Sequence, residues 1–340
     1  MQEKNLTGRK LHIEFLRIVA AFLVIVNHTN SRIFLGTQPS ALWLGSVSYF
    51  FVSKIAVPVF LMIMGAVLLS KQDSYKKYFS RIVRIAVAVI VFSTMMYLYY
   101  GGTNILIGIR EIFNSTHPPY WYLYMYLGLL LILPFMQKIA QTLDKKEMQM
   151  LLFVTVAIGG VAPMLQNIGF TVHDAFFYGL FSPYVGLVFA GYYVEKHMNI
   201  TPKTAVISAV AFVALVAAQV LVTLKSYYSR NGVDYLWLDD AKFLPITASA
   251  VCFYIVIKYI FANTNLFAKQ AKAVCFVGGL TFGVYLMADL AMMTLSPVYK
   301  TMAQSMPVMV AMIIFQVAIF VGAALLTAIL KCIPLVKKLL

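Results

Sequence analysis

Three ionisable side chains lie in the first apolar stretch of the chain, where a charge is costly unless it faces a partner or a cavity. They are Glu14, Arg17 and His28. If residues 11–31 form a helix, Glu14 lies within about 60° of Arg17 around its axis, and Arg17 within about 20° of His28. The helix then carries one polar stripe, along which Arg17 and His28 are about 16.5 Å apart. Glu14 and Arg17 suit an ion pair, and the imidazole suits proton exchange near neutral pH.

Four further ionisable residues extend this set. Arg81 and Arg84 are three residues apart on one helix face, which suits either phosphate binding or simple anchoring at the membrane surface. Asp289 is expected at the same depth as His28, where a carboxylate orients an imidazole and stabilises its charged form. Lys54 falls in the middle of the second apolar stretch and is expected to pair with either Asp289 or Glu14.

The elements that position these residues are membrane helices. Hydrophobic residues make up 61% of the 340 residues and charged residues only 11%, whereas soluble domains have 45–50% and about 25%. This composition excludes a soluble globular protein and a disordered chain. About ten stretches are long enough to span a bilayer, namely residues 11–31, 42–69, 80–100, 120–136, 148–166, 175–194, 204–224, 242–261, 273–295 and 307–331. We therefore predict an all-α polytopic bundle with a single domain over residues 1–340, a retained first helix, and a kink at Pro58.

The net charge of +15 mostly reports orientation. With the N-terminus inside, 19 of the 27 basic residues fall on the inner side, 6 on the outer side and 2 within the spans. This asymmetry follows the positive-inside rule and predicts that both termini are cytoplasmic, in a multi-pass protein of the cell membrane. A nucleic-acid partner is not expected. The three cysteines and the histidines follow no disulfide or metal-site spacing, so no metal is expected.

The order of short motifs resembles the integral-membrane acyltransferase 3 family, whose first helix has an acidic residue, then Arg, then His after ten intervening residues. Glu14, Arg17 and His28 match that pattern. Similar landmarks follow in the same order at residues 57–65, Arg81 and Arg84, residues 121–123 followed by Pro134, residues 191–193 and residues 283–286. The chain departs from the family where Met64 replaces a usual Ser, and where Pro119 and Ala288 stand in place of histidines that the family often has.

The resemblance implies transfer of an acyl group, commonly acetyl, from cytoplasmic acyl-CoA to a hydroxyl of an envelope polysaccharide or lipid-linked sugar. His28 is then either the general base or a transient acyl carrier, with Glu14 and Asp289 as the other catalytic residues. Arg17, Arg81 and Arg84 are then expected to bind the phosphates of CoA. The acceptor is expected to meet Asn27, Lys54, Trp121 and Tyr122.

Two other functions suit the same residues. A transporter or exporter of a polysaccharide or small solute would use the polar stripe as a proton or ligand path. The sequence has no visible internal repeat, which many transporters have. A membrane-bound ligand sensor without catalysis is the third interpretation.

Overall fold

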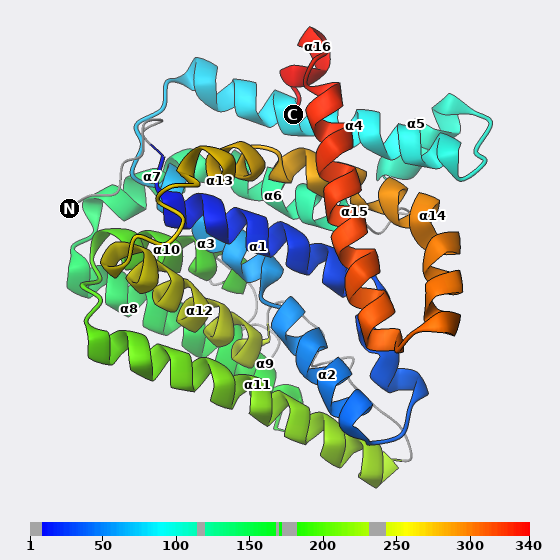
Figure 1. Cartoon of the computed structure of the whole chain (residues 1–340). Coiled ribbons are helices and arrows are strands. Elements are labelled where there is room, and N and C mark those ends of the chain that lie inside the picture. The colour runs from blue at the N-terminus through cyan, green and yellow to red at the C-terminus, as the bar shows by residue number, and fades with distance from the viewer. Residues whose placement is uncertain (1–8, 114–119, 168–169, 172–181, 231–242) are drawn as a thin grey trace.

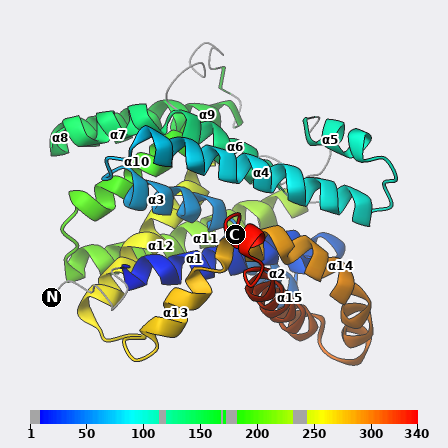
Figure 2. The same ribbon diagram turned by 90° about the horizontal axis from the view of Figure 1, so that it is seen from above.

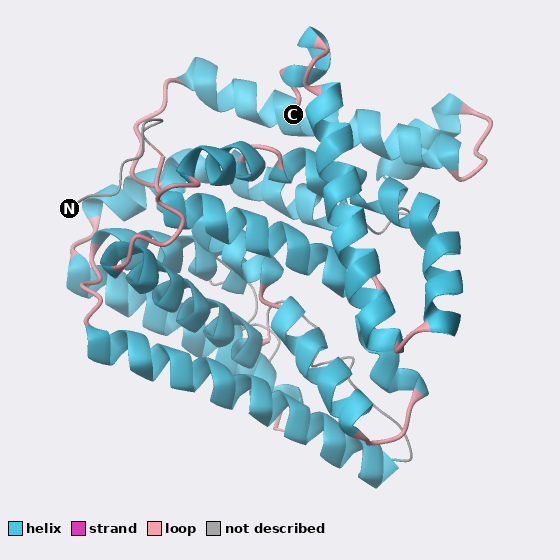
Figure 3. Ribbon diagram, in the orientation of Figure 1, coloured by secondary structure: helices cyan, strands magenta, loops and turns pink. Residues whose placement is uncertain are grey.

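The computed structural model describes residues 9–113, 120–167, 170–171, 182–230 and 243–340, and these form helices joined by short connections, without strands (Figure 3). The helices are α1 Leu11–His28, η1 Asn30–Gly36, α2 Ala41–Ser53, α3 Ala56–Leu68, α4 Tyr75–Tyr99, α5 Ile105–Phe113, α6 Trp121–Leu131, α7 Leu133–Thr142, α8 Lys145–Val156, η3 Ala157–Val161, α9 Ala162–Asn167, α10 Pro183–Lys196, α11 Pro202–Arg230, α12 Leu244–Asn263, α13 Ala271–Gly278, α14 Thr281–Ser305, α15 Val308–Leu330 and α16 Pro334–Lys337.

The predicted polytopic helical bundle is confirmed. Within the described residues, eight helical segments are long and apolar enough to cross a membrane, and the bent pair α6 and α7, at 59° to each other, makes a ninth. The predicted span over 175–194 begins in residues 172–181, which lie outside the described residues, and its second part is α10. The predicted span over 273–295 is divided between α13 and α14. The cytoplasmic location of the termini stays a prediction.

Helix α1 is the centre of the bundle (Figure 1). It packs against α2, α3 and α12 and also against α13, α14 and α15. Seen from above, it runs between the layer that holds α3, α4 and α6 and the layer that holds α13 and α15 (Figure 2). Glu14 of the polar stripe is therefore buried by protein, which avoids the cost of a charge in lipid, whereas His28 at the end of α1 is exposed.

The second predicted span is broken into α2 and α3. The break at Lys54 and Ile55 lies four residues before Pro58, which has no N–H to donate to the Lys54 carbonyl oxygen. This is the kink that the sequence predicts. It places Lys54 at the end of α2, in the middle of the bundle, with only 8% of the residue exposed.

Helices α3 and α10 cross at close range because each has a glycine at the crossing. A Cβ atom on Gly65 would lie 1.7 Å from the carbonyl oxygen of Val188, and one on Gly191 would lie 1.9 Å from that of Met62. Both obstacles are backbone atoms, which cannot rotate away. Small residues of this kind allow membrane helices to pack backbone to backbone, and the crossing fixes α3 against the rest of the bundle.

Replacing Gly65 with alanine should destabilise the protein by at least about 1 kcal/mol, because the two helices must separate to admit the methyl group. Thermal unfolding in detergent, followed by circular dichroism, measures the change. The matched control is Gly322→Ala in α15, where a Cβ would meet no atom within 4 Å. Equal midpoints for Gly65→Ala and the wild type would contradict the close crossing.

Candidate active site

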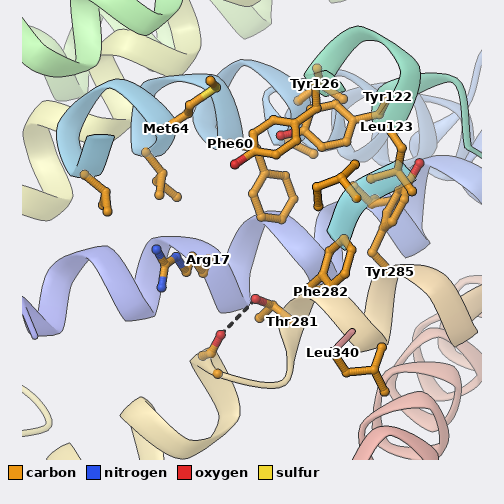
Figure 4. Close-up of a pocket in the computed structure, with 18 of the residues that line it drawn as sticks. Arg17, Phe60, Met64, Tyr122, Leu123, Tyr126, Thr281, Phe282, Tyr285 and Leu340 are labelled. Carbon is orange, nitrogen blue, oxygen red and sulfur yellow. Dashed lines mark hydrogen bonds between the residues drawn. The ribbon is translucent and has the colours of Figure 1, made fainter. Parts of the chain in front are cut away.

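A cavity of about 910 Å³, called the main cavity here, follows one face of α1 (Figure 4). From α1 it is lined by Arg17, Val24, Asn27 and His28, which recur at the helical period and so share a face. The opposite walls come from α3, α4, α6 and α14 and from the C-terminal residues. The cavity thus connects the two ends of the polar stripe that the sequence predicts.

The predicted ion pair at the first end of the stripe is confirmed. Arg17 Nη1 donates a hydrogen bond of 2.8 Å to Glu14 Oε1, and Arg9 Nη1 lies 3.8 Å from the other carboxylate oxygen. Glu14 is only 2% exposed and packs against Gly278, where a Cβ would lie 2.4 Å from Glu14 Oε2. Glu14 therefore stands behind the cavity wall and holds Arg17, whose guanidinium faces the cavity (Figure 4).

Five cationic residues line this end of the main cavity, which are Arg9, Arg17, Arg84, Lys331 and Lys337. Burial, with additional repulsion from Arg84 and Arg9, lowers the pKa of Lys331. Such a convergence of positive charge favours an anionic ligand. Arg9, Lys331 and Lys337 are not recognisable as site residues from the sequence, because they stand near helix ends and match ordinary positive-inside anchors.

Arg84 reaches the main cavity from α4 and also contacts the C-terminal residues. Its Nε donates to the carbonyl oxygen of Leu339 at 2.9 Å, and its Nη2 donates to that of Leu340 at 2.8 Å. The guanidinium also lies over the ring of Phe282, 5.5 Å from the ring centre. Contacts on two sides fix the guanidinium in the wall between α4 and α14.

Arg81, one turn before Arg84 on α4, is not among the residues that line the main cavity. Its guanidinium pairs with Asp73 in the segment before α4, and Lys77 Nζ lies 3.1 Å from the same carboxylate. The hydrogen bond from Arg81 is the main reason that the pKa of Asp73 falls to about 2. The structure therefore brings Arg84 to the cavity and leaves Arg81 outside the described lining.

The second end of the main cavity holds His28, Asn27 and Lys54. Asn27 Oδ1 is buried and accepts no hydrogen bond within the part of the chain that the structure describes. The Lys54 ammonium lies 4.5 Å from the centre of the Phe50 ring, a cation–π contact. The predicted partner Glu14 is instead engaged by Arg17 and Arg9.

A buried hydrogen-bond chain fixes the end of α1 beside His28. Tyr49 donates from its hydroxyl to Gln316 Oε1 at 2.8 Å, and Gln316 Nε2 donates to Thr29 Oγ1 at 2.8 Å. Thr29 in turn donates to the carbonyl oxygen of Ile25 at 2.8 Å. Gln316 has no exposed surface, so α2, α15 and α1 are joined where the candidate catalytic residue stands. The sequence pattern gave no signal for Gln316, which is one polar residue in an apolar helix.

A family model described as an acyltransferase domain matches residues 11–332, which is nearly the whole chain. The chain belongs to the acyltransferase 3 family. It is therefore a membrane acyltransferase. No curated protein and no solved structure matched the chain.

In this acyltransferase, the main cavity has an aromatic wall between its two ends. Trp121 and Tyr122, both predicted from the sequence, line it together with Phe60 and Tyr285. The Tyr122 ring lies 5.9 Å from each of the rings of Phe60, Tyr126 and Tyr285. This cluster joins α3, α6 and α14 (Figure 4), so the wall presents aromatic rings between the cations and His28.

The acyltransferase has a second, much smaller cavity of about 30 Å³ next to His28, called the side cavity here. It shares Val24, His28 and Tyr285 with the main cavity. Asp289 lines the side cavity, and its Oδ2 accepts a hydrogen bond of 3.0 Å from the Tyr100 hydroxyl. The structure thus brings Asp289 of α14 and His28 of α1 to one small space, as their equal depth in the sequence predicts.

Proposed function

We propose that this chain is an O-acyltransferase of the cell membrane that moves an acyl group, in the first place acetyl, from cytoplasmic acyl-CoA to a hydroxyl of an envelope polysaccharide or lipid-linked sugar. One observation carries the proposal. A single cavity joins a cluster of five cationic residues to His28, which lies about 16.5 Å from Arg17 along α1. That offset is comparable with the length of an extended pantetheine arm.

The donor binds with its phosphates at the cationic end. Arg17 and Arg84 present planar guanidinium groups that suit phosphate oxygens, and Arg9, Lys331 and Lys337 add positive charge around them. Glu14 acts as a positioning residue, because its ion pair holds the Arg17 guanidinium. The pantetheine arm then follows the aromatic wall, and the thioester reaches His28.

The transfer step at His28 is general-base catalysis. A ring nitrogen of His28 takes the proton of the acceptor hydroxyl while the hydroxyl oxygen attacks the thioester carbonyl carbon. The new carbon–oxygen bond forms, the carbon–sulfur bond breaks, and the CoA sulfur leaves with its electron pair and takes the proton from His28. The products are an ester and free CoA thiol, and His28 returns to its neutral form.

The acceptor enters at the His28 end. Asn27 Oδ1 is a buried acceptor without a donor among the described residues, and leaving it so costs about 1–3 kcal/mol. A sugar hydroxyl provides that donor. Trp121 and Tyr122 offer apolar ring faces with polar edges, and Lys54 offers a cation within reach of the same end of the cavity.

Asp289 stabilises the protonated imidazole of His28 across the side cavity, through the attraction between opposite charges. Replacing Asp289 with asparagine keeps its shape and removes its charge, so kcat should fall about tenfold, a change of about 1.4 kcal/mol. The KM for the donor should not change. Tyr100→Phe, which removes the hydrogen bond to Asp289 and keeps the charge, is the control and should lose less. Steady-state kinetics with acyl-CoA give both constants, and equal losses in the two variants would argue against a role of the charge.

The test of the function as a whole uses the purified protein in lipid nanodiscs, labelled acetyl-CoA, and membranes from a host that lacks the gene as the source of acceptor. Label should move to the glycan fraction, and one free CoA thiol should appear for each acetyl group transferred. If no label moves, while the protein in sealed vesicles carries a solute across the bilayer, the transporter interpretation replaces this one.

A further inference from the structure

The side cavity is much smaller than the main cavity that it adjoins, and most of the residues that line it are apolar. Its apolar walls are Val24, Ile25, Ala288, Met292 and Ile319. Ile25 is 2% exposed and Ile319 has no exposed surface, so the inner wall belongs to the packed core. The space of about 30 Å³ is two to three times the roughly 10–15 Å³ that one water-sized sphere needs. A space of this size suits a methyl or ethyl group better than a longer chain.

During the transfer step that we propose, three groups must be placed around the reacting carbonyl carbon of the thioester: the sulfur, the incoming hydroxyl and the carbon chain of the acyl group. The sulfur leads back along the pantetheine arm to the cationic end of the main cavity. The incoming hydroxyl comes from the acceptor at the His28 end of the same cavity. The carbon chain of the acyl group needs a third space next to the reacting carbon. The side cavity offers that space, because it adjoins the main cavity at Val24, His28 and Tyr285, which line both cavities.

We infer that the side cavity is the acyl-chain pocket of this enzyme and that Met292 and Ile319 set the upper limit of chain length at two or three carbons. This inference rests on the proposed function. Met292 comes from α14 and Ile319 from α15, and both line the space that receives the chain behind His28. Ala288 of α14 also lines the pocket, and its side chain is a single methyl group, so a larger side chain at this position would fill part of the space.

The selectivity expected from such a pocket is large. One methylene group that does not fit changes kcat/KM by roughly 10- to 200-fold. The wild type should therefore use acetyl-CoA at least about ten times better than butyryl-CoA. Removing side-chain atoms from the pocket floor should move this preference toward longer chains, with a smaller effect on the acetyl reaction.

The experiment compares acetyl-, propionyl-, butyryl- and hexanoyl-CoA as donors for the protein in nanodiscs, with membranes from a host that lacks the gene as acceptor. Free CoA thiol measures the rate, and the readout is the ratio of kcat/KM for butyryl-CoA to that for acetyl-CoA. Met292→Ala and Ile319→Ala should raise this ratio at least about tenfold. The matched control is Met64→Ala, because Met64 lines the main cavity and not the side cavity.

A narrowing variant covers the case in which the enlarged pockets prevent folding. Ala288→Val should lower the ratio of propionyl- to acetyl-CoA use, because the added methyl groups occupy the space for the third carbon. Ratios that stay at the wild-type value in Ala288→Val and both enlarging variants, or that shift equally in Met64→Ala, overturn the inference and leave the transferase intact. Absence of thiol release by the folded wild type with every donor overturns the proposed function and the inference together.

Discussion

Replacing His28 with alanine should lower kcat for acyl transfer by about 10²- to 10⁴-fold, the range that general acid–base catalysis contributes. The affinity for acyl-CoA should change little, because the cationic residues that bind the phosphates lie about 16.5 Å away along α1. Label transfer from acetyl-CoA to acceptor membranes measures kcat, and equilibrium binding of labelled acetyl-CoA measures Kd. A loss in kcat with constant Kd assigns His28 to the chemical step.

The control for this variant is another histidine outside the cavity. His197 follows α10 and stacks on Tyr193 with 5.9 Å between ring centres, and the described lining of either cavity does not include it. His197→Ala should retain activity within about threefold of the wild type, a difference of less than 1 kcal/mol. Comparable activity in His28→Ala and the wild type would remove His28 from the mechanism.

A second measurement on the wild type distinguishes the two roles that the sequence leaves open for His28. A general base needs the acceptor hydroxyl before the thioester breaks, so donor alone should release almost no CoA. A covalent carrier accepts the acyl group first and gives a burst of one CoA for each protein molecule. Rapid quench without acceptor, followed by mass analysis of the peptide that contains His28, separates the two.

The sequence predicted those parts of the site that depend on one helix. Glu14, Arg17 and His28 share a face because residues 11–28 form a continuous helix, and the spacing alone then places the ion pair and the imidazole. The sequence also predicts that Asp289 lies near His28, since the depth of a residue in the membrane can be counted along each of the two helices. Charge in a span is costly, so such residues are few and easily noticed.

The composition of the cationic cluster and the existence of the side cavity depend on how the helices pack together, which the spacing of residues along the sequence does not determine. Arg81 and Arg84 look equivalent on α4, and only the position of Asp73 and of the C-terminal residues separates them. Lys331 looks like an anchor until α15 is placed beside α14. The side cavity is formed by ordinary apolar residues, so it has no signature in the sequence.

Replacing Arg84 with glutamine should raise the Kd for acyl-CoA by about 10- to 150-fold, because a hydrogen bond to a charged group contributes about 1.5–3 kcal/mol. Arg81→Gln is the matched control, since it removes the same charge from the same helix at a residue that pairs with Asp73 outside the described cavity lining. Isothermal titration with acetyl-CoA in nanodiscs measures both, and thermal unfolding of each variant shows whether the bundle is intact.

The dependence on salt tells direct contact apart from a general surface potential. Interactions between exposed charges are screened within about 10 Å at 0.1 M salt, whereas a guanidinium within the wall of a cavity is screened much less. If Arg84 contacts the donor phosphates, the difference in Kd between Arg84→Gln and Arg81→Gln should persist at 0.3 M salt. Equal Kd values for the two variants at every salt concentration would mean that the donor is attracted by the basic surface as a whole, and that the cavity position of Arg84 has no special role.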